Sequence, residues 1–273
     1  MWAAMRLTSV LQAAAMLPFM RLLCALALVL SASATFALTP RELDVVGRRV
    51  WQNECSGTRE GLTSWNTGEN FASLGIGHFI WYPKGVEGPF EESFPPLVKF
   101  FNANGVKVPA WIKPEADCPW STRSEFLAAS KSDRMNELRD LLASTIQVQA
   151  RFLAQRMEQA LPKMLAAAPS PQRNKIKANY DRLAATTRGQ FALIDYVNFK
   201  GEGTKETERY AGEGWGLLQV LAGMGESEGA SPAALFAKSA EEVLTRRVHN
   251  APPDRHEEKW LNGWKNRVRA YVQ

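Results

Sequence analysis

The sequence predicts an α+β fold that is mostly α-helical, in which a small β-hairpin lobe and a helical C-terminal lobe enclose a cleft. Residues 62–82 interleave aromatic and aliphatic side chains with glycines and small polar residues, a pattern typical of short strands and turns. Residues 121–273 instead repeat apolar side chains at helical spacing behind capping residues. With 45% apolar and 22% charged residues in a chain of 273, a sizeable core is expected and disorder is not.

The first 37 residues have the pattern of a secretory signal peptide. Arg21 precedes a short apolar run, and small-residue sequences of the kind found at cleavage sites follow at residues 32–34 and 35–37. The apolar run is too short to predict a membrane span, although a retained N-terminal anchor is the alternative interpretation. We therefore expect a periplasmic or secreted protein with no stable membrane span after cleavage, in which residues 38–273 form a single domain.

Removal of that segment would leave two cysteines and a weakly basic chain. The formal net charge of +5 falls to about +3 because Arg6 and Arg21 are lost, and this charge does not predict nucleic-acid binding. Cys55 and Cys118 would then face an oxidising compartment, so we predict a disulfide between them, with two free thiols as the alternative. The sequence predicts no cofactor and no metal.

The first predicted helix covers residues 40–54. Thr39 is a hydroxyl N-cap, Pro40 occupies the first helical position, and Glu42 follows the cap by three residues, which together form a capping box. Apolar residues continue at helical spacing at Leu43, Val46 and Val50. This helix should deliver Glu54 at its C-terminal end.

The remaining elements follow in order. Residues 66–68 are a turn signal, so the β lobe, residues 55–83, should hold a short hairpin or a three-stranded sheet. Residues 83–120 form a proline-rich insertion that we expect to consist of loops and short turns. The helical lobe, residues 121–273, should contain helices over residues 121–126, 132 onward, 146–168 with an interruption at Pro162, 173–185, 187–199, 214–224, 232–236, 240–248 and 255–271.

Glu54 is the first candidate for chemistry because it ends a helix in front of the glycine-rich hairpin. Cleavage of a glycosidic bond needs a carboxylic acid that protonates the leaving oxygen and a second group that orients water or stabilises the developing cation. Glu69 and Ser73 on the hairpin can supply that second group. A glutamate in the solvated surface near a helix end is the simpler interpretation of Glu54.

Residues 65–78, WNTGENFASLGIGH, resemble the hairpin of phage-type lysozymes of the T-even kind. That family has an aromatic residue, a turn, a hydroxyl residue and then an aliphatic-Gly-aliphatic-Gly-His run. In the family the catalytic glutamate ends the helix just upstream. The resemblance places this glutamate on Glu54 and the catalytic threonine on Ser73.

Two further segments resemble the same family. Residues 192–204, ALIDYVNFKGEGT, are similar to its long core helix and the following turn. Residues 246–264, RRVHNAPPDRHEEKWLNGW, are similar to its C-terminal segment, in which an arginine after a proline turn pairs with the catalytic glutamate. The resemblance assigns that arginine to Arg255 and implies a lysozyme-like fold.

The sequence departs from this family at the second catalytic group. The family's aspartate falls on Thr67, and Glu69 is its obvious substitute, which would predict inversion at a carboxyl separation of roughly 6.5–9.5 Å. Without a base, a transglycosylase that closes an anhydro ring becomes the alternative.

Glu60 is the rival to Glu54 as the acid. His78 has no ligand cluster around it, and its expected role is to pin the hairpin.

We therefore predict a peptidoglycan glycosidase of the muramidase type that cleaves β-1,4 bonds and acts as a monomer on peptidoglycan or a related amino-sugar polymer. A non-catalytic glycan-binding module, a lytic transglycosylase and a chitosanase-like enzyme are the alternatives. The residues expected to contact sugar are Trp65, Asn66, Tyr82, Tyr210, Trp215 and Gln219.

Overall fold

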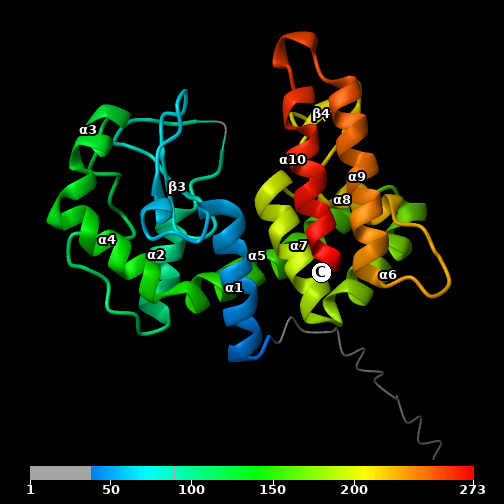
Figure 1. Ribbon diagram of the computed structural model, residues 1–273, viewed down its shortest axis with the longest axis horizontal. Helices are drawn as coiled ribbons and strands as arrows, with labels where there is room; N and C mark the ends of the chain where they lie inside the picture. The colour runs from blue at the N-terminus through cyan, green and yellow to red at the C-terminus, as the bar shows by residue number, and fades with distance from the viewer. Residues whose placement is uncertain (1–37, 89) are drawn as a thin grey trace, which may run out of the picture. The chain divides into compact units, whose positions relative to one another are not determined.

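Helix α1 (Pro40–Cys55) opens the part of the chain that the computed structural model describes, residues 38–88 and 90–273 (Figure 1). The predicted capping box is confirmed: the Glu42 amide donates to Thr39 Oγ1 at 3.3 Å, and the Thr39 amide donates to Glu42 Oε2 at 2.9 Å. The helix ends where Ser56 adopts a left-handed conformation. The predicted signal peptide, residues 1–37, lies outside the described residues.

Three short strands form the predicted antiparallel sheet. They are β1 (Thr63–Ser64), β2 (Ala72–Leu74) and β3 (Phe79–Trp81), in the spatial order β1-β2-β3. Ser73 lies at the centre of this sheet, opposite Ser64 on one side and Ile80 on the other. The sheet and the surrounding helices confirm a fold that is mostly α with a small β part.

The turn between β2 and β3 is fastened to helix α5 (Ile146–Ala167) by one buried glutamine. Gln149 Oε1 accepts a hydrogen bond from the Ile76 amide at 2.9 Å. Gly75 has a φ of +70°, and a Cβ there would lie 2.3 Å from that same oxygen, so only glycine fits. This tight turn carries His78, which is itself left-handed with a φ of 48°.

The prediction of loops and short turns for residues 83–120 is wrong in part, because helix α2 (Phe94–Ala103) lies within them. Pro95 and Pro96 fall in its first turn, where a missing amide hydrogen removes no intrahelical bond, so they start the helix instead of preventing it. The helix buries its apolar side chains at helical spacing: Phe94, Leu97, Val98 and Phe101.

The C-terminal half is helical as predicted. Thr122 and Ser132 cap the first two helices through their hydroxyls. Besides α5, this half contains α3 (Arg123–Ala128), α4 (Asp133–Ser144), α6 (Arg173–Ala184), α7 (Thr187–Lys200), α8 (Leu217–Gly223), α9 (Pro232–Asn250) and α10 (Glu258–Arg269). Strands β4 (Arg209–Tyr210) and β5 (Glu213–Gly214) pair between α7 and α8, and η1 (Glu60–Leu62) and η5 (Ala270–Val272) are single 3₁₀ turns.

Two details of the helices differ from the prediction. Helix α9 runs without a break through residues 232–250, although the pattern predicts separate helices over residues 232–236 and 240–248. The residues at the expected break, Ala237 and Ser239, are buried and continue the packed face. Helix α5 runs through Pro162, so the predicted interruption there is only local.

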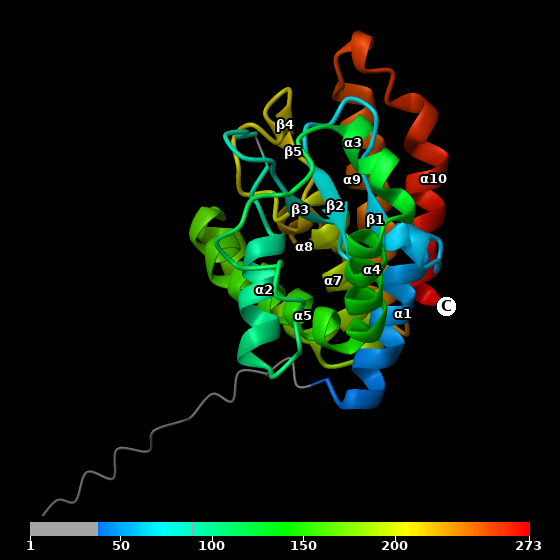
Figure 2. The same cartoon turned by 90° about the vertical axis from the view of Figure 1, so that its left-hand side faces the viewer.

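Helices α1 and α5 connect the two sides of the fold. They pack on each other, α5 also packs on α2, and both pack on α7 (Figures 1 and 2). The sheet, α2, α3 and α4 lie on one side of this pair, and α6–α10 lie on the other (Figure 1). Within residues 38–88 and 90–273, no helix has both the length and the apolar character needed to cross a bilayer.

Candidate functional site

Glu54 lies in the last turn of α1, where the sheet side and the helical side of the fold meet. Its side chain is 13% exposed. Oε1 accepts hydrogen bonds from Arg267 of α10 and from Asn198 Nδ2 of α7, the latter at 3.0 Å. Oε2 lies 3.6 Å from His78 Nδ1. One carboxylate thus joins three segments that are far apart in the sequence.

Arg267 is held on its other side by a second, fully buried carboxylate. Asp195 accepts from Arg267 Nε at 2.8 Å and from its second nitrogen at 2.9 Å. The Tyr271 hydroxyl donates to Asp195 at 2.6 Å, and Asn53 donates to it at 3.1 Å. Because Asn53 and Glu54 are neighbours in α1, the helix end is fixed to the network at two points.

The protonation of this network follows from burial and from its charges. Burial opposes the charge of the Arg267 guanidinium, but Asp195 and Glu54 outweigh it and raise the pKa of Arg267. Burial raises the pKa of Tyr271 far above its ordinary value, so its hydroxyl stays protonated and donates to Asp195. Burial also lowers the pKa of His78 despite the opposing charges of Glu54 and Glu69. His78 is therefore mostly neutral at pH 7.

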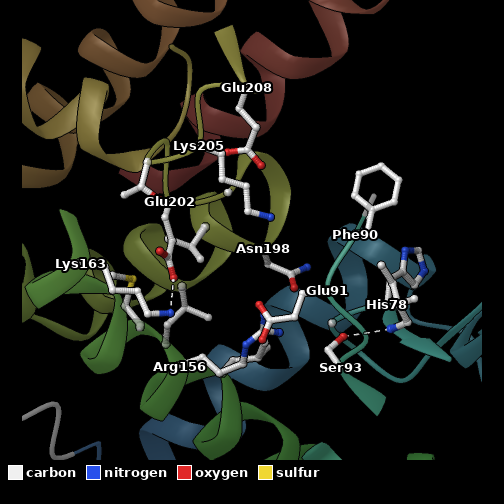
Figure 3. A pocket seen from close by; sticks show the side chains of 18 residues that line it. His78, Phe90, Glu91, Ser93, Arg156, Lys163, Asn198, Glu202, Lys205 and Glu208 are labelled. Atoms are coloured by element: carbon white, nitrogen blue, oxygen red, sulfur yellow. Dashed lines mark hydrogen bonds and ion pairs between the residues drawn. The ribbon is translucent and has the colours of Figure 1, made fainter. Parts of the chain in front are cut away.

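A cleft of about 380 Å³, whose lining side chains are shown in Figure 3, adjoins the partners of Glu54, although Glu54 itself does not line it. His78 and Asn198, two of the side chains that contact Glu54, are part of its wall. Glu91 and Ser93 come from the segment after β3, and α5, α7 and the turn after α7 supply the opposite wall. Its charged side chains carry both signs: Glu91, Arg156, Lys163, Glu202, Lys205 and Glu208.

A larger hollow of about 810 Å³ lies over α9 and α10. Its walls include Ala234, Ala237 and Val272 together with paired charges such as Glu241 and Arg269, which are 2.7 Å apart. Among the described residues, none of those that line this hollow hydrogen-bonds or ion-pairs with Glu54 or Asp195. The smaller cleft is the better candidate because it adjoins the buried charge network.

Neither of the two predicted partners of Glu54 on the hairpin, Glu69 and Ser73, lines the cleft. Glu69 is close enough for its charge to raise the pKa of His78, so Glu54 and Glu69 both act on one imidazole. Within the described part of the chain, Glu69 Oε2 is buried and finds no hydrogen-bond partner. Ser73 is buried in the central strand. Thr67 is exposed in the hairpin turn.

The predicted contact between Arg255 and Glu54 is wrong. Arg255 is 56% exposed, and its nearest carboxylate is Glu257 at 4.0 Å. The guanidinium on Glu54 is that of Arg267, in the helix that follows. Arg255 lies in the turn before α10. Arg267 lies within α10, next to Val268, which is buried in the core.

Three of the predicted sugar-contacting residues belong to the β lobe. Trp65 and Tyr82 are buried, Trp65 against Phe126 with ring centroids 5.7 Å apart. The Trp65 indole donates to the Glu69 carbonyl at 2.8 Å, so it supports the hairpin. Asn66 is exposed in the turn. None of the three lines the cleft.

The other three belong to the segment around β4, β5 and α8. Trp215 is buried with the Arg247 guanidinium 4.1 Å from its ring centroid. The Tyr210 hydroxyl donates to Glu257 at 3.0 Å. Gln219 caps α8 by accepting from the Gly216 amide at 2.9 Å. These residues stabilise the helical side and also lie outside the cleft lining.

The predicted disulfide is wrong, because Cys55 and Cys118 are free, buried thiols with separate surroundings. Cys55 Sγ lies 3.5 Å from the Gly75 carbonyl, under the β2–β3 turn. Cys118 instead pairs with Pro83 through a β-bridge, and its amide donates to the Tyr82 carbonyl at 2.9 Å. Burial raises the pKa of each thiol to about 12.

These surroundings predict that neither thiol reacts in the folded protein, because a thiolate is needed for attack and access is blocked. We expect iodoacetamide to leave Cys55 and Cys118 unmodified in native protein and to modify both in urea without any reductant. Peptide mapping by mass spectrometry measures this. Modification that requires a reductant would instead show that the two are disulfide-bonded.

Lys200, at the end of α7, lies between two arginines and two aromatic rings. Its Nζ is 3.4 Å from the centroid of Trp264 and 4.0 Å from that of Phe199. Arg267 contacts the same Phe199 ring at 4.2 Å, and Arg247 contacts Trp264 at 5.0 Å. Burial, reinforced by the charge of Arg247, lowers the pKa of Lys200 to about 6.

This pKa predicts how stability depends on pH. The unfolded chain keeps a proton on Lys200 up to about pH 10.4, but the folded protein releases it above about pH 6, so this group opposes folding most below pH 6. We expect Lys200→Met to raise the free energy of unfolding by about 2–4 kcal/mol at pH 7, with the gain shrinking toward pH 10. Urea unfolding at several pH values measures this, and a gain that does not change with pH would contradict it.

Sequence reasoning missed Arg267, Asp195 and Asn198. Asp195 does leave a signal, since a lone aspartate inside the apolar run FALIDYV is expected to be buried and must then have a partner. Asn198 follows it by three residues and so shares its helix face. Arg267 leaves no comparable signal among the many basic residues of the C-terminal segment.

Among the described residues, no group of three His, Cys, Asp or Glu side chains comes together in a way that could hold a metal ion. Comparison of the chain with protein-family models, with curated proteins and with solved structures finds no match in any of the three. The chemistry of the cleft and of the network around Glu54 is therefore the basis for a functional proposal.

Proposed function

We propose that this protein is a glycosidase that cleaves β-1,4 bonds in peptidoglycan or a related amino-sugar polymer, with Glu54 as the general acid. The observation that carries the proposal is the position of the Glu54 carboxyl group. It ends a helix, contacts His78 and Asn198 in the cleft wall, is mostly shielded from water, and is oriented by Arg267 and Asn198. The N-terminal signal pattern supports action on a polymer outside the cytoplasm.

In this proposal the protonated Glu54 donates to the leaving oxygen of the scissile bond. Oε1 is occupied by two donors, so Oε2, which faces His78 and the cleft wall, is the oxygen that can carry the proton. Arg267 then stabilises the carboxylate that remains after transfer. Asp195 and Tyr271 keep the guanidinium in place and so preserve the geometry through the reaction.

Glu69 is the proposed partner for the water, with Ser73 as support for the hairpin that carries it. Glu69 Oε2 has no hydrogen-bond partner among the described residues, and the charge of Glu69 raises the pKa of His78, the imidazole that also faces Glu54. Both observations favour a role for Glu69 near His78. If Glu69 activates water, the reaction is hydrolytic and the products carry reducing ends. If it does not, Glu54 can act alone and the sugar closes on itself to give anhydro ends.

A non-catalytic glycan-binding module is the second candidate. The exposed position of Thr67, where the resembling family has its aspartate, favours it. This candidate keeps the cleft and the charge network but predicts no bond cleavage.

Mass spectrometry of fragments released from purified peptidoglycan, chitin and chitosan tests the proposal. We expect soluble fragments from peptidoglycan, with reducing or anhydro ends that identify the reaction. Release of fragments from chitosan alone would show that chitosan, and not peptidoglycan, is the substrate. An absence of fragments from all three, with the protein pelleting with one of the polymers, would favour the binding module and contradict the glycosidase.

A further inference from the structure

We propose that Phe90 is the platform on which a sugar ring of the polymer stacks at the rim of the cleft, an inference that rests on the glycosidase function proposed above. At 56%, Phe90 is the most exposed of the large apolar side chains in residues 38–88 and 90–273. It lines the cleft together with His78 and Asn198, the two side chains that reach from the cleft wall to Glu54.

Exposure alone does not mark a binding site, since single exposed apolar side chains are ordinary. Trp260 of α10 is also exposed, at 43%, but it lies outside the cleft and stacks on Trp264. Phe90 differs because its exposed ring borders a hollow with polar and charged walls. Figure 3 shows the ring at the rim, across the opening from Lys205 and Glu208.

The ring is held on a rigid support. Phe71 contacts it edge-on, with centroids 5.8 Å apart and planes at 76°, an arrangement in which the two ring faces do not stack on each other. The Tyr82 hydroxyl donates to the Phe90 carbonyl at 3.3 Å. Ser93 and Ile80 exchange two hydrogen bonds of 3.0 Å, which tie the segment after Phe90 to β3. A support of this kind limits the entropy lost on binding.

A pyranose ring is the ligand that suits this surface. It presents a flat face of C–H groups that packs on an aromatic ring, and hydroxyl or amide groups at its edge that need hydrogen bonds. The opposite wall offers such partners in Asn198, Lys205 and Glu208. Phe90 thereby sets the position of the polymer relative to Glu54 without touching the reacting atoms.

The test compares Phe90→Ala, Phe90→Leu and Phe90→Trp in two settings. The first is the rate of fragment release from purified peptidoglycan as its concentration is varied, and the second is pelleting of the same variants with peptidoglycan in a Glu54→Gln background. Trp260→Ala is the matched control, because it removes an exposed aromatic ring outside the cleft. Circular dichroism checks that each variant is folded.

We expect Phe90→Ala and Phe90→Leu to weaken pelleting and to raise KM by about five- to tenfold with little change in kcat, and Phe90→Trp to preserve both. Leucine keeps apolar area but not a flat face, so a leucine variant that matches wild type would overturn the stacking role. Unchanged pelleting in the alanine variant would overturn it as well. If the wild-type protein releases no fragments but Phe90→Ala and Phe90→Leu pellet less than their Phe90 parent, the platform would be supported and only the glycosidase contradicted.

Discussion

Replacing Glu54 by glutamine is expected to reduce fragment release from peptidoglycan by about 10²–10⁴-fold, the contribution typical of a general acid. Glutamine has nearly the same shape and keeps an oxygen that can accept from Arg267 and Asn198, so the site should survive. It has no proton to give to the leaving oxygen. Initial rates measured at saturating polymer, together with pelleting of the variant, separate a loss of chemistry from a loss of binding.

Glu60→Gln is the matched control for this result. Glu60 is the other candidate acid in the same segment, but it is exposed in η1, and Arg267 and Asn198 donate to Glu54 instead. We expect its activity to stay within about twofold of wild type, because an exposed surface substitution changes little. A large loss in Glu60→Gln with normal activity in Glu54→Gln would exchange their roles and remove the proposed acid.

Replacing Asp195 by alanine is expected to lower the free energy of unfolding by about 3–5 kcal/mol, the cost of removing one partner from a buried ion pair. Asp195 is fully buried and accepts from Arg267, Tyr271 and Asn53. Its loss leaves the Tyr271 hydroxyl without a partner and the Arg267 guanidinium with only Glu54. Urea unfolding followed by circular dichroism measures the change.

Asp181→Ala gives the comparison for this destabilisation. Asp181 also pairs with a cation, Lys177 at 2.6 Å, but the pair is solvated on the surface of α6. We expect a cost of at most about 0.5 kcal/mol there. If Asp195→Ala cost no more than Asp181→Ala, the buried network would not be holding α1, α7 and α10 together as described.

Local signals in the sequence predicted most of the fold. The Thr39 capping box placed the first helix, and the apolar and small residues in 62–82 predicted a short hairpin or a three-stranded sheet, of which the sheet is observed. Pro95 and Pro96 led to a wrong prediction of loops, because prolines occur both in loops and in the first turn of a helix. Only the apolar spacing after them indicates the helix. The break predicted in α9 is absent because Ala237 and Ser239 are small, buried residues that suit a tightly packed helix face.

The site was less predictable because it depends on contacts between distant segments. Glu54 could be located at a helix end from its own neighbourhood in the sequence. The choice between Arg255 and Arg267 could not be made that way, because it depends on the angle at which α10 meets α1 and α7. Which aromatic residues are exposed could not be predicted either. Trp65, Tyr82 and Trp215 are buried in the core, whereas Phe90, in the proline-rich segment, lines the cleft.

The most direct measurement for the central claim is a crystal structure of the Glu54→Gln variant bound to a peptidoglycan oligosaccharide. We predict that the sugars occupy the cleft, with a bridging glycosidic oxygen within hydrogen-bond distance of residue 54 and one ring against Phe90. An oligosaccharide bound elsewhere, for example over α9 and α10, with the cleft beside Glu54 empty, would contradict the assignment of Glu54 as the acid of a glycosidase.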